Sequence, residues 1–226
     1  MGWFRYMTQL QQFLWRPSSR LQAKLDDAMK VTGLANALEN GNVIGMHVRQ
    51  GDACGDDPLF RGRACMPLSN FMKYADKLRN QSGASTIYLA TDSQDILKET
   101  SKYPEYTFLH WPDSMAIKEK MRSEWNLTTL YWDWQFHQNI ATNHWDYNRE
   151  TADTSIIEMM MLSKAHHFVG QSTSNFFRTA LELKSAECDC MPAFYSLDAP
   201  WCFDFAVKAG KNVYNHDSTS EHKWLC

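Results

Sequence analysis

The sequence predicts an α/β protein with a mostly parallel, Rossmann-like sheet flanked by helices. Short apolar stretches of strand length alternate along the chain with stretches whose apolar residues recur at helical spacing. Consecutive parallel strands need a crossover between them, and a helix is the usual crossover. The chain has 226 residues, of which 44% are hydrophobic, so it can form one sizeable domain, alone or with a small appendage.

The first elements are a helix and a buried strand. Ser18 or Ser19 is expected to cap a helix over residues 17–29, in which Leu21, Leu25 and Ala28 share one face, and Gly33 is expected to end it. Continuous apolar character predicts a strand at Asn42–Val48. The same signals predict the remaining strands at Thr86–Ala90, Tyr106–His110 and Phe168–Gly170, and helices at Phe71–Arg79, Gln94–Lys102, Asp153–His166 and Thr173–Lys184.

Charge and composition exclude some functions and favour a location. The formal net charge of -3 argues against nucleic acid as a partner. No stretch has the length and hydropathy of a membrane span, and the N-terminus lacks the pattern of a signal peptide. Six cysteines and two glycosylation sequons, at Asn80 and Asn126, favour a lumenal or extracellular location. Cys54 and Cys65 could close a short loop as a disulfide.

Polar clusters follow three of the predicted strands. The first runs from His47 and Arg49 to Asp57, the second is centred on Asp92, and the third covers residues 171–175. In open parallel sheets, ligands bind beyond the carboxyl ends of the strands. We therefore expect the three clusters to meet on one rim and form a binding site.

The third cluster predicts an anion site. Gly170 allows a sharp turn, and Ser172, Thr173, Ser174 and Asn175 then open a helix whose first N–H groups lack partners within the helix. The alternative is that the hydroxyls only cap the helix. Arg49, with a planar fork suited to phosphate, favours the anion site, unless it is paired with Asp52 or Asp92. A phosphate or pyrophosphate fits both parts.

Four segments in order resemble one enzyme family. Residues 43–52, with His47, Arg49 and Asp52, resemble the His-x-Arg-x-x-Asp motif of the α-1,6-fucosyltransferases, which are related to the nodulation and protein O-fucosyltransferases. Three later segments are similar to further motifs of this family, namely residues 88–92, 155–180 and 194–198. The resemblance covers most of the chain.

The resemblance implies a fold, a reaction and a location. It implies an inverting, metal-independent transfer of fucose from GDP-fucose to a glycan, an N-glycan or a chitin-like chain, in the Golgi or the secretory-pathway lumen. No cofactor is expected. The fold would be of the two-domain GT-B type, with residues 39–226 as its Rossmann-like donor-binding half. Residues 1–38 would be a helical lead-in, a remnant of the other half or the connection to it.

The resemblance also implies roles for single residues. Arg49 would hold the β-phosphate, and the main chain of His47 with the carboxylate of Glu158 would read guanine. Ser174 would contact phosphate, together with Ser172 and Thr173 of the predicted anion site, here called the anion turn. Asn175 would lie near fucose. Asp57 would be the catalytic base. The supporting carboxylates on the acceptor side would be Asp52, Asp92 and Asp198.

The sequence also departs from the family pattern. Gln50 replaces a second arginine, Ala53 a lysine, and Ser93 and Ala199 replace aspartates. A non-catalytic GDP-sugar-binding fragment or scaffold is therefore an alternative, as is a transferase that uses another nucleotide sugar.

Two further features have simpler interpretations. The aromatic residues of 126–148 could stack on an acceptor sugar, but packing of a loop is the preferred interpretation. Cys188 and Cys190, together with His166 and His167, could suggest a zinc site, but their spacing fits no common one. A disulfide or buried thiols are therefore expected.

Overall fold

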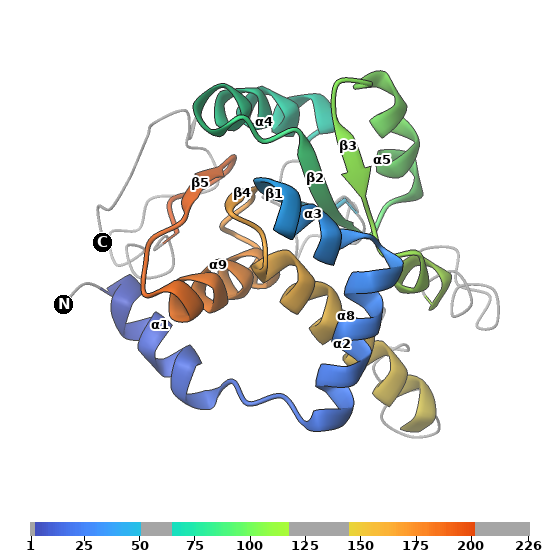
Figure 1. Ribbon diagram of the computed structural model, residues 1–226, viewed down its shortest axis with the longest axis vertical. Helices are drawn as coiled ribbons and strands as arrows, with labels where there is room; N and C mark the ends of the chain where they lie inside the picture. The colour runs from blue at the N-terminus through green and yellow to red at the C-terminus, as the bar shows by residue number, and fades with distance from the viewer. Residues whose placement is uncertain (1–2, 51–64, 118–144, 202–226) are drawn as a thin grey trace.

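Five parallel strands form the central sheet of the protein (Figure 1). A computed structural model describes residues 3–50, 65–117 and 145–201. The strand order is β3-β2-β1-β4-β5, and every neighbouring pair is parallel. The strands are β1 Val43–Val48, β2 Thr86–Thr91, β3 Thr107–Leu109, β4 His167–Gly170 and β5 Ala193–Ser196. The predicted α/β class with a parallel, Rossmann-like sheet is confirmed.

Helices cover both faces of this sheet, which explains why every residue of β1 is buried (Figure 1). Ile44, Met46 and Val48 pack in the cluster under α4, Leu68–Ser82, and α5, Gln94–Glu99, which a short 3-10 turn follows at Thr100–Lys102. Val43 packs in the opposite cluster, under α8, Trp145–Ser163, and α9, Asn175–Cys188. Successive side chains of β1 thus enter two different cores.

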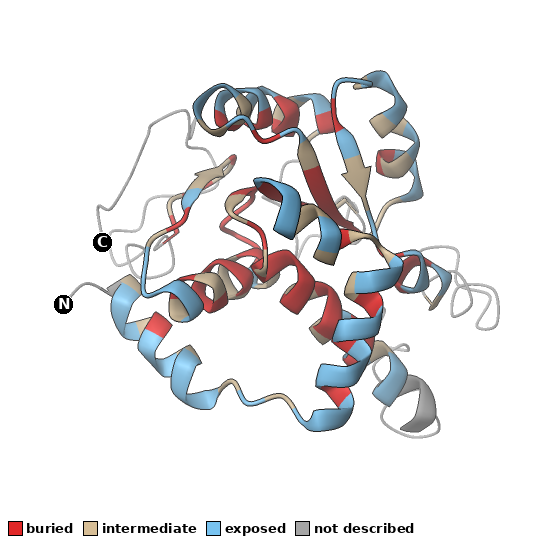
Figure 2. Ribbon diagram, in the orientation of Figure 1, coloured by how far each residue is buried: buried red, intermediate tan, exposed pale blue. Residues whose placement is uncertain are grey.

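Three N-terminal helices add an outer layer on the α8 and α9 side (Figure 2). They are α1 Trp3–Leu14, α2 Ser19–Val31 and α3 Leu34–Asn40. Ser18 is the N-cap of α2, because its Oγ accepts the Leu21 N–H at 3.3 Å. Gly33, with φ of 73°, separates α2 from α3. On α1, Gln11 donates to the Glu182 carboxylate of α9 at 3.1 Å.

The structure differs from the sequence-based expectation at several elements. α8 begins at Trp145 rather than Asp153, so part of the aromatic stretch expected to be a loop is helical. α9 begins at Asn175 rather than Thr173. β5 and α3 were not predicted. β5 lies at the sheet edge, where its partly exposed side chains give no continuous apolar signal.

The strand order reverses between β1 and β4. From β1 the chain proceeds to β2 and β3 on one side, and β4 and β5 then extend the sheet on the other side. The carboxyl ends of β1 and β4 therefore form the topological switch point, where open α/β sheets bind ligands. The fold places the predicted anion turn and Arg49 at this point.

Two further findings concern membrane-spanning helices and the cysteines. None of the helices in the described ranges is long and apolar enough to cross a membrane. Cys188 and Cys190 form a disulfide, so these thiols do not make a zinc site with His166 and His167. Cys65 is also disulfide-bonded, while its proposed partner Cys54 lies outside the described residues.

Candidate functional site

The strand register brings the polar clusters to one rim. His47 and Val48 pair with Ala90 and Thr91 of β2, so Asp92 leaves the sheet level with Arg49. Met46 pairs with Val169, and the same register carried one residue further sets His47 beside Gly170. Gly170 in turn pairs with Ser196, which precedes Asp198. Arg49, Asp92 and residues 171–175 therefore lie at the same edge of the sheet, as expected, while the rest of the first cluster, with Asp52 and Asp57, lies outside the described residues.

The turn from β4 into α9 does not behave as a simple side-chain cap. Ser174 is the N-cap residue of α9, but its side chain makes no capping hydrogen bond. Ser172, Thr173 and Ser174 are all buried. The Ser172 Oγ is fully enclosed and has no hydrogen-bond partner among the residues that the structure describes. A buried hydroxyl without a partner is costly, so this atom points to a ligand.

Asp198 lies against the same turn. The Thr173 hydroxyl donates to one of its carboxylate oxygens, and the Ser196 hydroxyl donates to the other at 3.2 Å. Desolvation raises the pKa of Asp198, although these hydrogen bonds oppose the rise. The structure therefore joins Thr173, predicted on the donor side, to Asp198, predicted on the acceptor side. The Thr173 hydroxyl is thus engaged, and the Ser172 N–H donates to Ser196 Oγ at 3.0 Å. The Ser174 N–H donates to the Gln171 carbonyl at 3.0 Å. The Ser172 hydroxyl and the N–H groups of the first turn of α9 are therefore the donors left for an anion.

His47 holds α9 against β1. Its ring stacks on Phe176 with centroids 4.9 Å apart and lies 6.5 Å from Phe177. Phe177 reaches this place because Gly170 has no side chain: a Cβ there would lie 2.3 Å from the Phe177 ring. The imidazole is buried, so His47 contributes packing beneath the rim in addition to its predicted main-chain role.

Gln50 joins the ends of β1 and β2. Its N–H donates to Asp92 Oδ1 at 2.9 Å, and its side-chain amide donates to the Met66 carbonyl at 3.1 Å. The Ser93 hydroxyl donates to Gln50 Oε1 at 3.3 Å. Two of the four departures from the family pattern, Gln50 and Ser93, thus bond to each other. Asp92 is fixed by a backbone donor, which makes it a support for the strand end next to Arg49.

Two residues predicted for the donor site, Glu158 and Asn175, lie in different surroundings from each other. Glu158 is buried in α8, where burial and then the Glu158 charge raise the pKa of Tyr88. Tyr88 pairs with Gly45 in the middle of β1, below the rim. Asn175 is exposed at the start of α9, and its amide oxygen accepts from Arg178. Asn175 thus lies at the end of the turn with its amide oxygen engaged, and Glu158 lies on a different helix.

The remaining predicted residues are at the start of the chain segment after β1. Arg49 follows β1 at the rim and is partly buried. Asp52 and Asp57 lie outside the described residues, so the predicted base stays a prediction.

Sequence reasoning missed Phe176, Phe177, Ser196 and the role of Gln50. The period of two along β1 assigns His47 to the α9 face, and the two phenylalanines directly follow the serine-rich turn. These signals could have predicted the stacking. The bonds of Gln50 and Ser196 have no sequence signal, because each joins strands far apart in the chain.

Comparison with known families decides the class of the protein. Residues 2–131, more than half of the chain, match the family described as alpha-(1,6)-fucosyltransferase N- and catalytic domains. The chain belongs to this fucosyltransferase family. No curated protein matches the chain closely enough to be counted as a relative.

Family membership makes the chain a glycosyltransferase-type protein. In general terms, such a fucosyltransferase uses a nucleotide-sugar donor and a glycan acceptor, and the family suggests the secretory pathway. The match includes β1 and β2 and ends before α8. The β4–α9 turn of this fucosyltransferase is therefore linked to the family by its motif and by its place beside β1.

Proposed function

We propose that the chain binds GDP-fucose at the carboxyl ends of β1 and β4 and transfers fucose to a glycan hydroxyl, with inversion and without a metal. The observation that carries this proposal is the buried Ser172 hydroxyl, which has no hydrogen-bond partner among the described residues. It lies in the turn before α9, at the switch point and beside the strand that leads to Arg49. The disulfide between Cys188 and Cys190 supports an oxidising compartment such as the Golgi or the secretory-pathway lumen.

The rim has the chemistry that a diphosphate needs. α9 has 14 residues, and the N-terminal end of a helix of this length carries partial positive charge and free N–H groups. Ser172 adds a hydroxyl and Arg49 adds a fixed positive charge. Asp198 would repel a phosphate when ionised, but its raised pKa lets it take up a proton more readily than an ordinary carboxyl.

These groups would act on the bond that breaks. Departure of GDP from fucose places negative charge on the pyrophosphate, and preorganised donors at Arg49 and the α9 start would stabilise that charge. The acceptor hydroxyl must lose a proton on the opposite face of the sugar, for which Asp57 is the proposed base. Glu158 and the main chain of His47 are proposed to bind guanine, and Asn175 to lie near the sugar. Asp52 and Asp92 would support the acceptor side.

Calorimetry with GDP and a transfer assay with GDP-fucose test the proposal together. Acceptors are an N-glycan ending in N-acetylglucosamine and a chitin oligosaccharide, and EDTA is present to test metal independence. We expect GDP binding and transfer by the chain, and loss of transfer with retained GDP binding for Asp57→Asn. Absence of GDP binding by the folded chain would reject the donor site. Transfer by Asp57→Asn would show that another base acts, and a preference for GDP-mannose or UDP-sugars would change the donor.

A second function is favoured by the environment of Gln50. Its side chain is tied to Met66 and Ser93 instead of offering a second positive charge, and Ala53 replaces a lysine. A non-catalytic GDP-sugar-binding scaffold would need only the anion turn. GDP binding without any hydrolysis or transfer, for each acceptor, would support this function over catalysis.

A further inference from the structure

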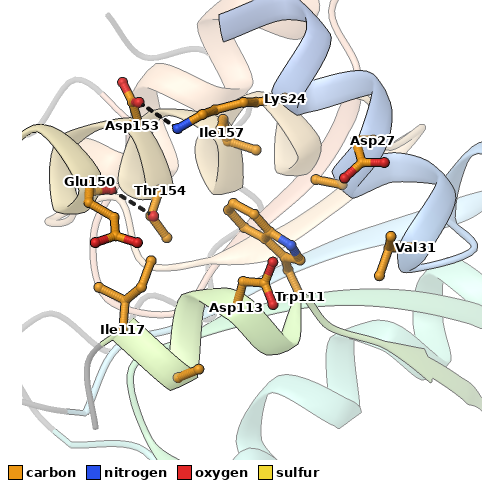
Figure 3. Close-up of a pocket in the computed structure, with 12 residues that line it drawn as sticks. Lys24, Asp27, Val31, Trp111, Asp113, Ile117, Glu150, Asp153, Thr154 and Ile157 are labelled. Carbon is orange, nitrogen blue, oxygen red and sulfur yellow. Dashed lines mark hydrogen bonds and ion pairs between the residues drawn. The ribbon is translucent and has the colours of Figure 1, made fainter. Parts of the chain in front are cut away.

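A second concave site lies between α2, α8 and the helical turn at residues 112–117 that follows β3 (Figure 3). The pocket has a volume of about 470 Å³, within the range of sites for small ligands. None of the residues predicted for sugar transfer lines it. The pocket is therefore separate from the residues predicted for sugar transfer.

The inner surface of this pocket is apolar. Trp111, only 8% exposed, lies in the same core cluster as Ala28 of α2 and Ile157 of α8, and all three line the pocket. Figure 3 shows the indole of Trp111 between the two helices, with Ile117 on one side and Val31 on the other. Tryptophan is the side chain whose ring face attracts a cation most strongly.

One wall of the pocket is an ion-pair network in which two basic residues share one carboxylate. Asp153 accepts two bonds from Arg20, one of them at 2.8 Å, and a third from Lys24 at 2.9 Å. The bond from Arg20, followed by those of Lys24, holds the pKa of Asp153 well below its usual range. Lys24 is the only basic residue among those that line the pocket, and it shares Asp153 with Arg20, so this network keeps one positive charge. The three further carboxylates at the opening outnumber that charge.

Three further carboxylates surround the opening. Asp27 of α2, Asp113 of the turn after β3 and Glu150 of α8 line the pocket and are exposed. Across the described ranges, the structure gives none of them a basic partner. In Figure 3, Asp113 lies beside the Trp111 indole and Glu150 lies beside Ile117. The site thus combines an apolar floor with uncompensated negative charge.

We propose that this pocket binds an alkylammonium cation, a positively charged amine carried on an apolar carbon chain. The chain would lie on Trp111 and Ile157, and the ammonium group would bind Asp113 and Glu150. An anionic ligand is disfavoured by the same carboxylates. A bare metal ion fits poorly, because nowhere in the described residues do three acidic, histidine or cysteine side chains gather closely enough to hold one.

The amine could be a free diamine or a lysine side chain of another protein, and both present the same chemistry. Isothermal titration calorimetry at low salt with 1,6-diaminohexane tests the first source. The neutral control is 1,6-hexanediol, which has the same chain without charge. A blocked Gly-Lys-Gly peptide tests the second source, with its Nε-acetyl-lysine form as the neutral control.

A matched pair of double variants locates the binding. Asp113→Asn with Glu150→Gln should weaken diamine binding by at least about fivefold, since each removes one ammonium–carboxylate interaction. Asp95→Asn with Glu105→Gln removes the same two charges from exposed positions outside the pocket and should leave the affinity unchanged.

Each outcome decides the proposal. Binding of the diamine but not the diol, weakened only in the pocket variant, supports it, and added binding of the lysine peptide extends it to a protein partner. Binding of the peptide alone supports a lysine side chain as the occupant. The proposal is overturned if neither amine binds, if the neutral controls bind equally well, or if both double variants behave alike.

Discussion

The rim at the carboxyl ends of β1 and β4 and the pocket beside α8 suit ligands of opposite charge and are built differently. The rim at β1 and β4 offers Arg49, a buried serine hydroxyl and the N-terminal end of α9, which suit an anion. The pocket beside α8 offers Trp111 and an apolar floor, with carboxylates that have no basic partner in the described ranges, and these groups suit a cation. The rim is assembled from strand ends, whereas the pocket is assembled from helices. The comparison teaches that one α/β scaffold can offer a site for one kind of ligand at its strand ends and a site for another kind between its helices.

The largest expected effect concerns the charge on the rim. Arg49→Ala should weaken GDP binding by about 1.5–3 kcal/mol, the range for a hydrogen bond to a charged group. Calorimetry with GDP measures this, and diamine binding at the pocket should not weaken. Arg5→Ala is the control, because Arg5 pairs with Asp189 on an exposed surface. Equal GDP affinity of the folded Arg49 variant and the parent would remove Arg49 from the site.

The next effect concerns the wall of the pocket. Asp153→Asn should lower the free energy of unfolding at pH 7 by about 1–2 kcal/mol, since charged hydrogen bonds to half-exposed Arg20 and Lys24 are lost. Urea unfolding measures it. Asp95→Asn, at an exposed pair with Lys98, should change stability by less than about 0.5 kcal/mol.

The pH dependence of the same variant provides a second measurement. The native pKa of Asp153 is depressed, so the carboxylate stabilises the fold above its unfolded pKa, near 4, and this contribution is lost as the pH falls further. The parent should therefore approach the variant in stability as the pH is lowered below 4. A constant difference in stability between pH 7 and pH 3 would contradict this origin.

The smallest effect separates binding from stability at Ser172. Ser172→Ala removes a buried hydroxyl that has no partner in the described part of the chain, so the free energy of unfolding should stay equal or rise. GDP affinity should fall by about 0.5–1.5 kcal/mol. Ser163→Ala should show the reverse, because its hydroxyl donates to the Met160 carbonyl at 2.7 Å in the buried core. Loss of stability without loss of affinity in Ser172→Ala would make it a structural residue.

The sequence predicted the rim better than the pocket for a physical reason. Each polar cluster of the rim is continuous in the chain, and the parallel sheet dictates that the clusters meet. The pocket takes its residues from α2, the turn after β3 and α8, whose relative placement depends on packing. Asp27, Asp113 and Glu150 therefore look in the sequence like ordinary solvated carboxylates.

The same distinction applies to the fold. Strands β1, β2 and β4 are buried on both faces, so their apolar runs were predictable. β5 is an edge strand whose side chains, except at its exposed first residue, are only partly buried, and it was not predicted. The first turns of α8 were expected to be a loop because of their aromatic residues, and the length of this helix comes from tertiary structure.

Phe177 packs so closely on Gly170 that the turn formed by residues 171–174 has little space in which to rearrange. A methyl group at position 170 would displace the Phe177 ring, whose centroid lies 6.5 Å from that of the His47 imidazole. The disturbance would therefore pass from β4 to β1. We therefore expect the turn to change little when the proposed ligand binds, so that little ordering entropy would be lost on binding.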